Sequence, residues 1–88
     1  MTGDLADLKQ VTVSSSAGLE ALGITILTNI KYLALIPAGT LYFALADAAS
    51  ASTAPMPTGG IAFPIKYGNA RLLQFYASSV GMTVMQFA

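Results

Sequence analysis

Charged side chains are so scarce in this chain that its folded surface cannot be an ordinary one. The 88 residues carry four acids and four bases and are 55% hydrophobic, whereas an average domain of this length carries about 22 charges. Much of the surface that water would normally cover is therefore expected to be buried against other protein chains. The chain reads as a component of an assembly. Its charged residues are Asp4, Asp7, Lys9, Glu20, Lys31, Asp47, Lys66 and Arg71.

The length permits one small domain with one core. A folded monomer of this mass exposes roughly 4,900 Å² by the scaling of surface with mass. The chain has no Cys and no His, so neither a disulfide nor a cysteine-rich metal site can stabilise such a small core, and oligomerisation is the remaining common means. A net charge of zero gives no long-range field to attract nucleic acid or an anionic membrane. We expect partners of neither kind.

One stretch is apolar enough to raise the possibility of a membrane helix. Residues 24 to 45 are interrupted by Asn29 and Lys31 and then by Pro37 and Gly39, where a spanning helix is normally unbroken. A small membrane protein, such as a lysis factor, stays an alternative that helical circular dichroism would support. The first residues are acidic and precede no apolar run, so no signal peptide is expected.

Short apolar runs with turn residues between them predict an all-β fold. Turn signals recur roughly every ten residues, and no long helical pattern intervenes. The expected class is an antiparallel β-sandwich, jelly-roll-like or immunoglobulin-like, of six to seven short strands. The expected strands cover residues 9–14, 24–30, 31–36, 40–45, 61–65, 71–77 and 82–87.

The most distinct local pattern is at residues 31 to 45. A short Pro37-Ala38-Gly39 turn between two apolar runs predicts a β-hairpin. Both arms are apolar at nearly every position, which indicates strands covered on both faces, by a second sheet on one side and a neighbouring chain on the other.

Two segments are expected to reach neighbouring chains. Residues 1–8 are interpreted as an N-terminal arm, with one helical turn and with Leu5 and Leu8 as docking points. Residues 9–88 are interpreted as the single β-sandwich domain, in which the loop at residues 46–60, including Met56, makes contacts. Adjacent aromatic residues at 42–43 and 75–76 place one member of each pair away from the core, and Tyr42 and Tyr76 are the candidate interface anchors.

Nothing in the residue inventory predicts catalysis, a metal or a cofactor. The serines have no histidine as a base, and the four acids lie in the arm and in loops, so neither nucleophilic nor paired-carboxylate chemistry is expected. The glycines match no phosphate-binding loop. Stacking of sugars on Tyr32, Tyr42 or Tyr76 stays open as a carbohydrate-binding or receptor-binding alternative.

Several segments in their order along the chain resemble small structural virion proteins of tailed bacteriophages. These are the strand at residues 11–15, the Tyr-Phe-Ala-Leu strand at 42–45 followed by Asp47, the Pro-Thr-Gly-Gly stretch at 57–60, and the strand pair at 69–76 and 82–84. The resemblance implies a β-sandwich that acts as a capsid decoration or cement subunit, or as part of the head-tail connector, tail or baseplate. It implies a location in the virion after assembly in the host cytoplasm, with the major capsid protein or another virion protein as partner.

We therefore expect a non-enzymatic subunit that self-associates, with a trimer favoured, and stabilises a shell by burying apolar surface. It is expected to need no cofactor. The candidate interface residues are Leu5, Leu8, Tyr42, Met56 and Tyr76.

Overall fold

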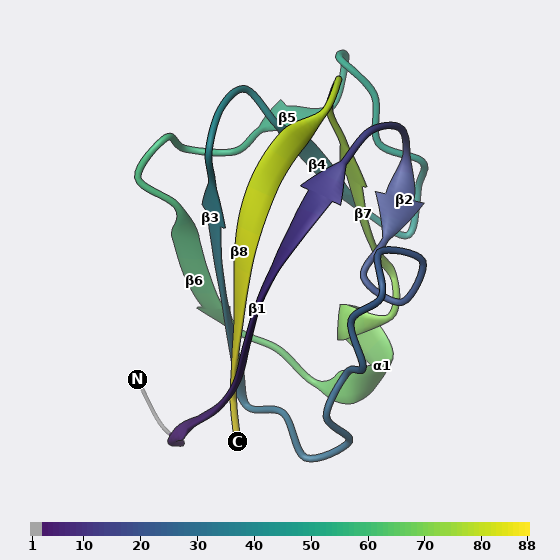
Figure 1. Ribbon diagram of the computed structural model, residues 1–88. Helices are drawn as coiled ribbons and strands as arrows, with labels where there is room; N and C mark the ends of the chain where they lie inside the picture. Colours follow the sequence, from purple (N-terminus) through teal and green to yellow (C-terminus); the bar gives the residue numbers. More distant parts are fainter. Residues whose placement is uncertain (1–2) are drawn as a thin grey trace.

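Two antiparallel four-stranded sheets pack face to face in the computed structural model, which describes residues 3–88 (Figure 1). The β-sandwich expected from the sequence is therefore confirmed. These residues contain eight strands and not the expected six to seven, and two of the eight are only two residues long. Sheet A has the order β1, β8, β3, β6, with bounds Leu5–Val13, Val80–Phe87, Tyr32–Pro37 and Ile61–Pro64. Sheet B has the order β2, β7, β4, β5, with bounds Ala17–Gly18, Leu73–Tyr76, Tyr42–Leu45 and Ala54–Pro55.

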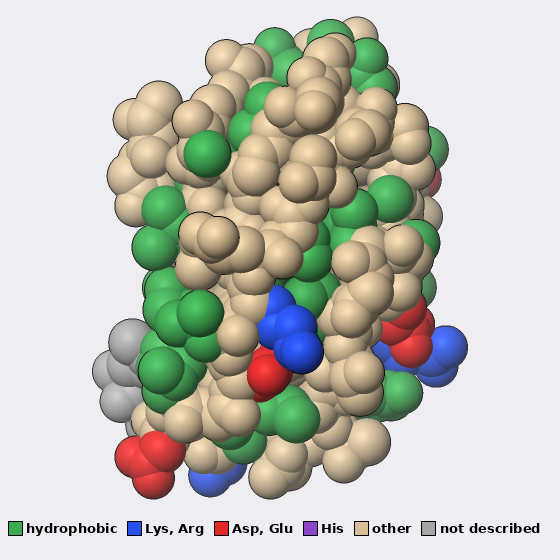
Figure 2. All heavy atoms as spheres, viewed as in Figure 1, with side chains coloured by type: hydrophobic (Ala, Val, Ile, Leu, Met, Phe, Trp, Pro, Cys, Tyr) green, Lys and Arg blue, Asp and Glu red, His purple; other side chains and the backbone are tan. Residues whose placement is uncertain are grey.

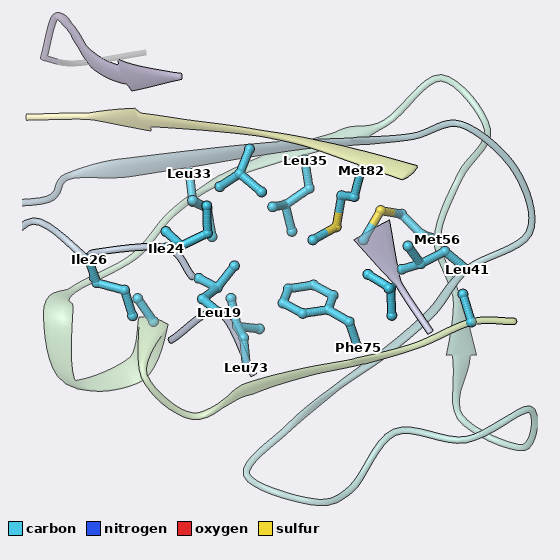
Figure 3. Close-up of a cluster of buried hydrophobic side chains, with 14 of the residues drawn as sticks. Leu19, Ile24, Ile26, Leu33, Leu35, Leu41, Met56, Leu73, Phe75 and Met82 are labelled. Atoms are coloured by element: carbon cyan, nitrogen blue, oxygen red, sulfur yellow. The ribbon is translucent and has the colours of Figure 1, made fainter. Parts of the chain in front are cut away.

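The core lies between the two sheets and follows the period-two alternation of their strands. Leu33, Leu35 and Met82 project inward from sheet A and face Leu73 and Phe75 from sheet B (Figure 3). All five side chains are buried. Because successive strand residues point to opposite faces, each strand that contributes to this core also presents a second set of side chains to the outside.

The strand expected at residues 24–30 is absent, and one buried polar side chain bonds to the backbone of that segment instead. Ile24, Ile26 and Ile30 are buried, but the segment forms no strand. The fully buried amide of Gln86 supplies hydrogen bonds that a neighbouring strand would otherwise provide. Its Oε1 accepts the Leu27 N–H at 2.8 Å, and its Nε2 donates to the Thr25 carbonyl at 2.9 Å. The isoleucines fill the core while part of the backbone between them bonds to a side chain.

The predicted hairpin at residues 31–45 is wrong. Strand β3 belongs to sheet A and β4 to sheet B, so the turn between them crosses from one layer to the other. The chain turns inward because Pro37 and Leu41 are buried and the Ala38 N–H bonds to the Gly81 carbonyl of β8 at 2.8 Å. Strand β4 pairs instead with β7 and β5.

The helical turn expected in the first eight residues is also wrong. Leu5 to Leu8 begin β1, which pairs with β8 along its whole length, while Met1 and Thr2 lie outside the described residues. The loop at 46–60 contains β5 and buries Ala49 and Met56. Pro64 ends β6 at the edge of sheet A, the position that its missing N–H predicts.

Helical structure in residues 3–88 is confined to α1 (Tyr67–Ala70), a single turn between β6 and β7. No helix in the described chain has the length and apolar character needed to cross a bilayer.

Replacement of Gln86 by leucine should destabilise the fold strongly. The change keeps the volume but leaves the Leu27 N–H and the Thr25 carbonyl without their partner, and each buried unsatisfied group costs about 1–3 kcal/mol. We expect the free energy of unfolding of Gln86→Leu, measured by urea denaturation, to fall by about 2–5 kcal/mol. The control is Gln10→Leu, at an exposed position of β1, which should stay within about 0.5 kcal/mol of the parent. Equal effects of the two substitutions would contradict this role for Gln86.

Candidate interaction surface

The outward side chains of sheet A form one surface, which we call the outer A face. The registers pair Leu8 with Met85, Ala34 with Met85, and Ala34 with Ala62, and directly paired residues project to the same side of a sheet. Extension of this alternation along all four strands defines the face. Its members are Leu5, Leu8, Gln10, Thr12, Tyr32, Ala34, Ile36, Ala62, Pro64, Gly81, Thr83, Met85 and Phe87.

No member of the outer A face carries a charge, and nine of the thirteen are apolar. Leu5, Leu8 and Ile36 are 53%, 55% and 41% exposed. In Figure 2 most of the charged atoms lie in the lower half of the view, and hydrophobic side chains gather along its left side, where β6 and β3 run in Figure 1. A sheet face turned to water is normally polar at these positions, so this face has the chemistry of a buried one.

The outer A face contains two hollows into which side chains of a partner could fit. A hollow of about 530 Å³ lies over Gly81, lined by residues of β1, β3 and β8 that include Thr12, Ile36 and Thr83. A second hollow of about 210 Å³ lies between β3 and β6, and Gly60 and Ala62 contribute to its lining. Ile36 lines both hollows. Projections beside hollows are the usual basis of shape complementarity at protein interfaces.

The five candidate interface residues lie in three different places. Leu5 and Leu8 belong to the outer A face, where they are members of β1 and not of an arm. Tyr42 and Tyr76 pair on the outward side of sheet B, as the alternation predicts, with ring centroids 6.4 Å apart. Met56 is buried in the core and so is not on the surface.

Three tyrosines considered for sugar stacking do not form one site. Tyr32 lies on the outer A face, whereas Tyr42 and Tyr76 lie on the opposite sheet. The nearest groove to that pair, of about 470 Å³, is lined by small and hydroxyl-bearing residues with no carboxylate among them. Nothing in its lining therefore supplies the acidic partner that often fixes a sugar ring.

The ionisable groups do not converge on a reaction centre. Within residues 3–88 the only ion pair joins Glu20 Oε1 to Arg71 Nε at 3.1 Å, with both side chains about half exposed. The hydrogen bond and then the charge of Glu20 raise the pKa of Arg71 above its usual value, so this guanidinium stays a cation. The Arg71 Cζ also lies 5.7 Å from the centre of the Tyr67 ring. No group of three or more metal-ligating side chains occurs in the described part of the chain.

An apolar groove opens between the sheets on the β6 side. It has a volume of about 360 Å³, and its walls include Phe43, Leu45, Ile61, Phe63 and Leu73. Asn69 is the one polar side chain in its lining. The groove could accept an apolar side chain but has no set of polar groups that would orient a small substrate.

Most of the outer A face was missed among the site residues chosen from the sequence. Ile36, Met85 and Phe87 lie on it with Leu5 and Leu8. The available signal was the apolar character of both alternating sets in the two expected strands at residues 31–36 and 40–45, which predicted covered faces without showing which set the core would take, and only the first of these strands belongs to sheet A. Pairing of β1 with β8 brings Leu5 and Leu8 onto the same surface, and a sequence pattern does not contain that pairing.

Comparison of the chain with protein-family models, with curated proteins and with solved structures finds no match in any of the three. The candidate function therefore depends on the surface itself and on the resemblance described from the sequence.

Substitution of Gly60 should disturb the outer A face at its second hollow. The backbone of Gly60 has φ of +91°, and a Cβ there would lie 2.6 Å from the Leu35 carbonyl oxygen. Gly60→Ala combines strain with a clash against a strand backbone and should lower the free energy of unfolding by about 1–3 kcal/mol. Gly59→Ala is the matched control, because a Cβ at Gly59 meets nothing within 4 Å. Thermal or urea unfolding of both variants measures the difference, and equal stabilities would exclude this constraint.

Proposed function

We propose that this chain is a non-enzymatic structural subunit that self-associates and is incorporated into a larger protein shell by covering its outer A face. The observation that supports this most strongly is the complete lack of charge on a four-stranded sheet face that the chain does not cover itself. A contiguous exposed apolar patch of this kind on a small protein marks an interaction site.

The size of the face is consistent with such a role. Four strands about 4.8 Å apart, with about 3.3 Å per residue over roughly seven residues, cover about 440 Å². Nine of the thirteen positions are apolar, which is about 300 Å² of this area, and at about 25 cal/mol per Å² its burial favours association by roughly 8 kcal/mol before the costs of association are subtracted. A standard interface buries about 800 Å² per partner, so the face supplies about half of one, and neighbouring surfaces must supply the rest.

Charge is placed at one end of sheet A. Asp4 exchanges two backbone hydrogen bonds with Ala88, and the Lys31 N–H bonds to the Phe87 carbonyl at 2.7 Å. Both residues are exposed, so polar groups border the apolar face at this end. An apolar centre with a polar border is the usual arrangement of a protein interface.

A capsid decoration or cement subunit of a tailed phage is the specific form that we propose. The sequence resemblance supports it, and a flat apolar face on a two-layer sandwich suits a subunit that lies on a larger protein surface. A place in the head-tail connector, tail or baseplate would use the same face and is the alternative within the same class.

A lysine on the outer A face should weaken self-association. Ile36→Lys introduces a charge that must lose its hydration if the face is covered, whereas Leu72→Lys changes a similarly exposed hydrophobic residue outside the face. We expect sedimentation velocity to show concentration-dependent oligomers for the parent chain and for Leu72→Lys. For Ile36→Lys we expect a shift toward smaller species, with the strand-type circular dichroism retained. A parent chain that stays monomeric at every accessible concentration would refute self-association.

The location of the subunit is tested by labelling. Antibodies raised against the purified chain should decorate the head surface of intact phage particles from the source of this sequence when viewed by electron microscopy. A label at the head-tail joint or along the tail supports the alternative location. Particles that contain none of the chain by mass spectrometry refute a virion role.

A further inference from the structure

Strand β1 is a long edge strand with no partner on its outer side in the described chain. Its nine residues pair with β8 only, and it ends the order of sheet A. The opposite edge of that sheet is a four-residue strand that carries Pro64, and the two edges of sheet B are two residues long. Proteins usually shorten or block their edges because an open edge pairs with another chain. Three of the four edges here carry a proline or are very short, whereas β1 is nine residues long and carries only the bulge between Leu5 and Asp7 and the charges of Asp7 and Lys9.

The two charges of β1 are arranged for pairing with a second copy of the same strand. Asp7 and Lys9 are two residues apart, so they project to the same side, with Leu8 between them on the other side. Asp7 is held in place, because its Oδ2 accepts a hydrogen bond from Gln86 Nε2 at 3.2 Å. If two copies of β1 run antiparallel about a two-fold axis at Leu8, Asp7 of each copy faces Lys9 of the other.

Other symmetric registers lose this match. A two-fold axis at Asp7 places two carboxylates opposite each other, and an axis at Lys9 places two ammonium groups opposite each other. An axis at Gln10 leaves both charges facing valines, since Lys9 would meet Val11 and Asp7 would meet Val13. Like charges directly opposite destabilise a strand pair, and unlike charges stabilise it. The Leu8-centred register is the one that pairs both charges of each copy.

We propose that the partner at this edge is a second copy of the chain, joined by antiparallel pairing of the two β1 strands about Leu8. This inference rests on the proposed function, because it names the contact through which copies associate. The two sheets then form one eight-stranded sheet. The two-fold axis is perpendicular to that sheet, so both outer A faces lie on the same side and form one larger apolar surface.

The length of the new ladder is set by the bulge between Leu5 and Asp7. Regular pairing extends from Ala6 to Gln10 in each copy, and alternate pairs exchange two bonds each, which gives about four to six main-chain hydrogen bonds. Leu8 meets Leu8 of the second copy at the centre of the outer side. A contact of this symmetry forms dimers and even-numbered assemblies, and does not by itself form the trimer favoured from the sequence.

Single cysteines test the register directly, because the chain has none of its own. Opposed residues of antiparallel strands have Cα atoms about 4.5–5.5 Å apart, within the range that a disulfide spans. Under mild oxidation Leu8→Cys should form a covalent dimer, seen on a non-reducing gel. The control Thr12→Cys, on the same side of the same strand, should stay monomeric, because two copies of residue 12 lie about 27 Å apart along the ladder. Equal cross-linking of both variants, or of neither, overturns the proposal.

A second background separates this contact from the outer A face. In the double variant Leu8→Cys with Ile36→Lys, the edge stays intact while the face carries a charge. A covalent dimer in this background supports the edge contact even if the face has no role in self-association. If the double variant forms no cross-link while the single variant Leu8→Cys does, the copies are joined by the outer A face. That result overturns the edge contact.

Charge variants give an independent measurement. Lys9→Asp places one carboxylate opposite Asp7 of the other copy in each half of the dimer and should raise the dimer dissociation constant about ten- to hundred-fold. Lys9→Met removes the charge while it keeps the apolar stem, and should have a smaller effect. Addition of Asp7→Lys chains to Lys9→Asp chains should restore a mixed dimer, provided that circular dichroism shows both to be folded. If Asp7→Lys does not fold, the test is the comparison of the dimer dissociation constants of Lys9→Asp and Lys9→Met. A larger constant for Lys9→Asp supports the proposal, and equal constants overturn it.

Discussion

Two layers of sheet can cover only two of their four faces, and the structure depends on this constraint. Sheet B covers the inner face of sheet A with the core around Phe75, and a chain of 88 residues has no third layer to place over the outer face. In most sandwiches polar side chains make the outer faces compatible with water. Here the outer A face keeps apolar side chains, so the architecture that completes the core also leaves an apolar surface that residues 3–88 do not cover.

Gln86 connects the core to the edge strand β1. Its amide forms hydrogen bonds with the backbone of Thr25 and Leu27 in the irregular segment, and it also donates one to the Asp7 carboxylate at the edge of the sheet. A buried polar network of this kind favours a single arrangement, because any alternative leaves its members without partners. Order at the edge strand is therefore tied to the order of the core, which suits a strand that must present a fixed register.

The distribution of charge describes an assembly component better than a binding or catalytic site. The charged residues are not members of the outer A face, so two protein surfaces can meet there without like charges in opposition. No set of carboxylates or bases converges within residues 3–88. An edge that joins copies and a face that joins other surfaces would let one small subunit extend as a layer.

The sequence by itself determined the fold class, the outward position of one member of each aromatic pair at residues 42–43 and 75–76, the edge position of Pro64, and the apolar character of both sides of β3 and β4. These follow from alternation and from the missing N–H of proline, which act within a few residues. Only the tertiary structure decided that residues 31–45 cross between sheets, that Met56 is buried, and that Leu8 lies beside Met85. These depend on pairing between distant segments, and the free energy that selects one pairing comes from the whole core.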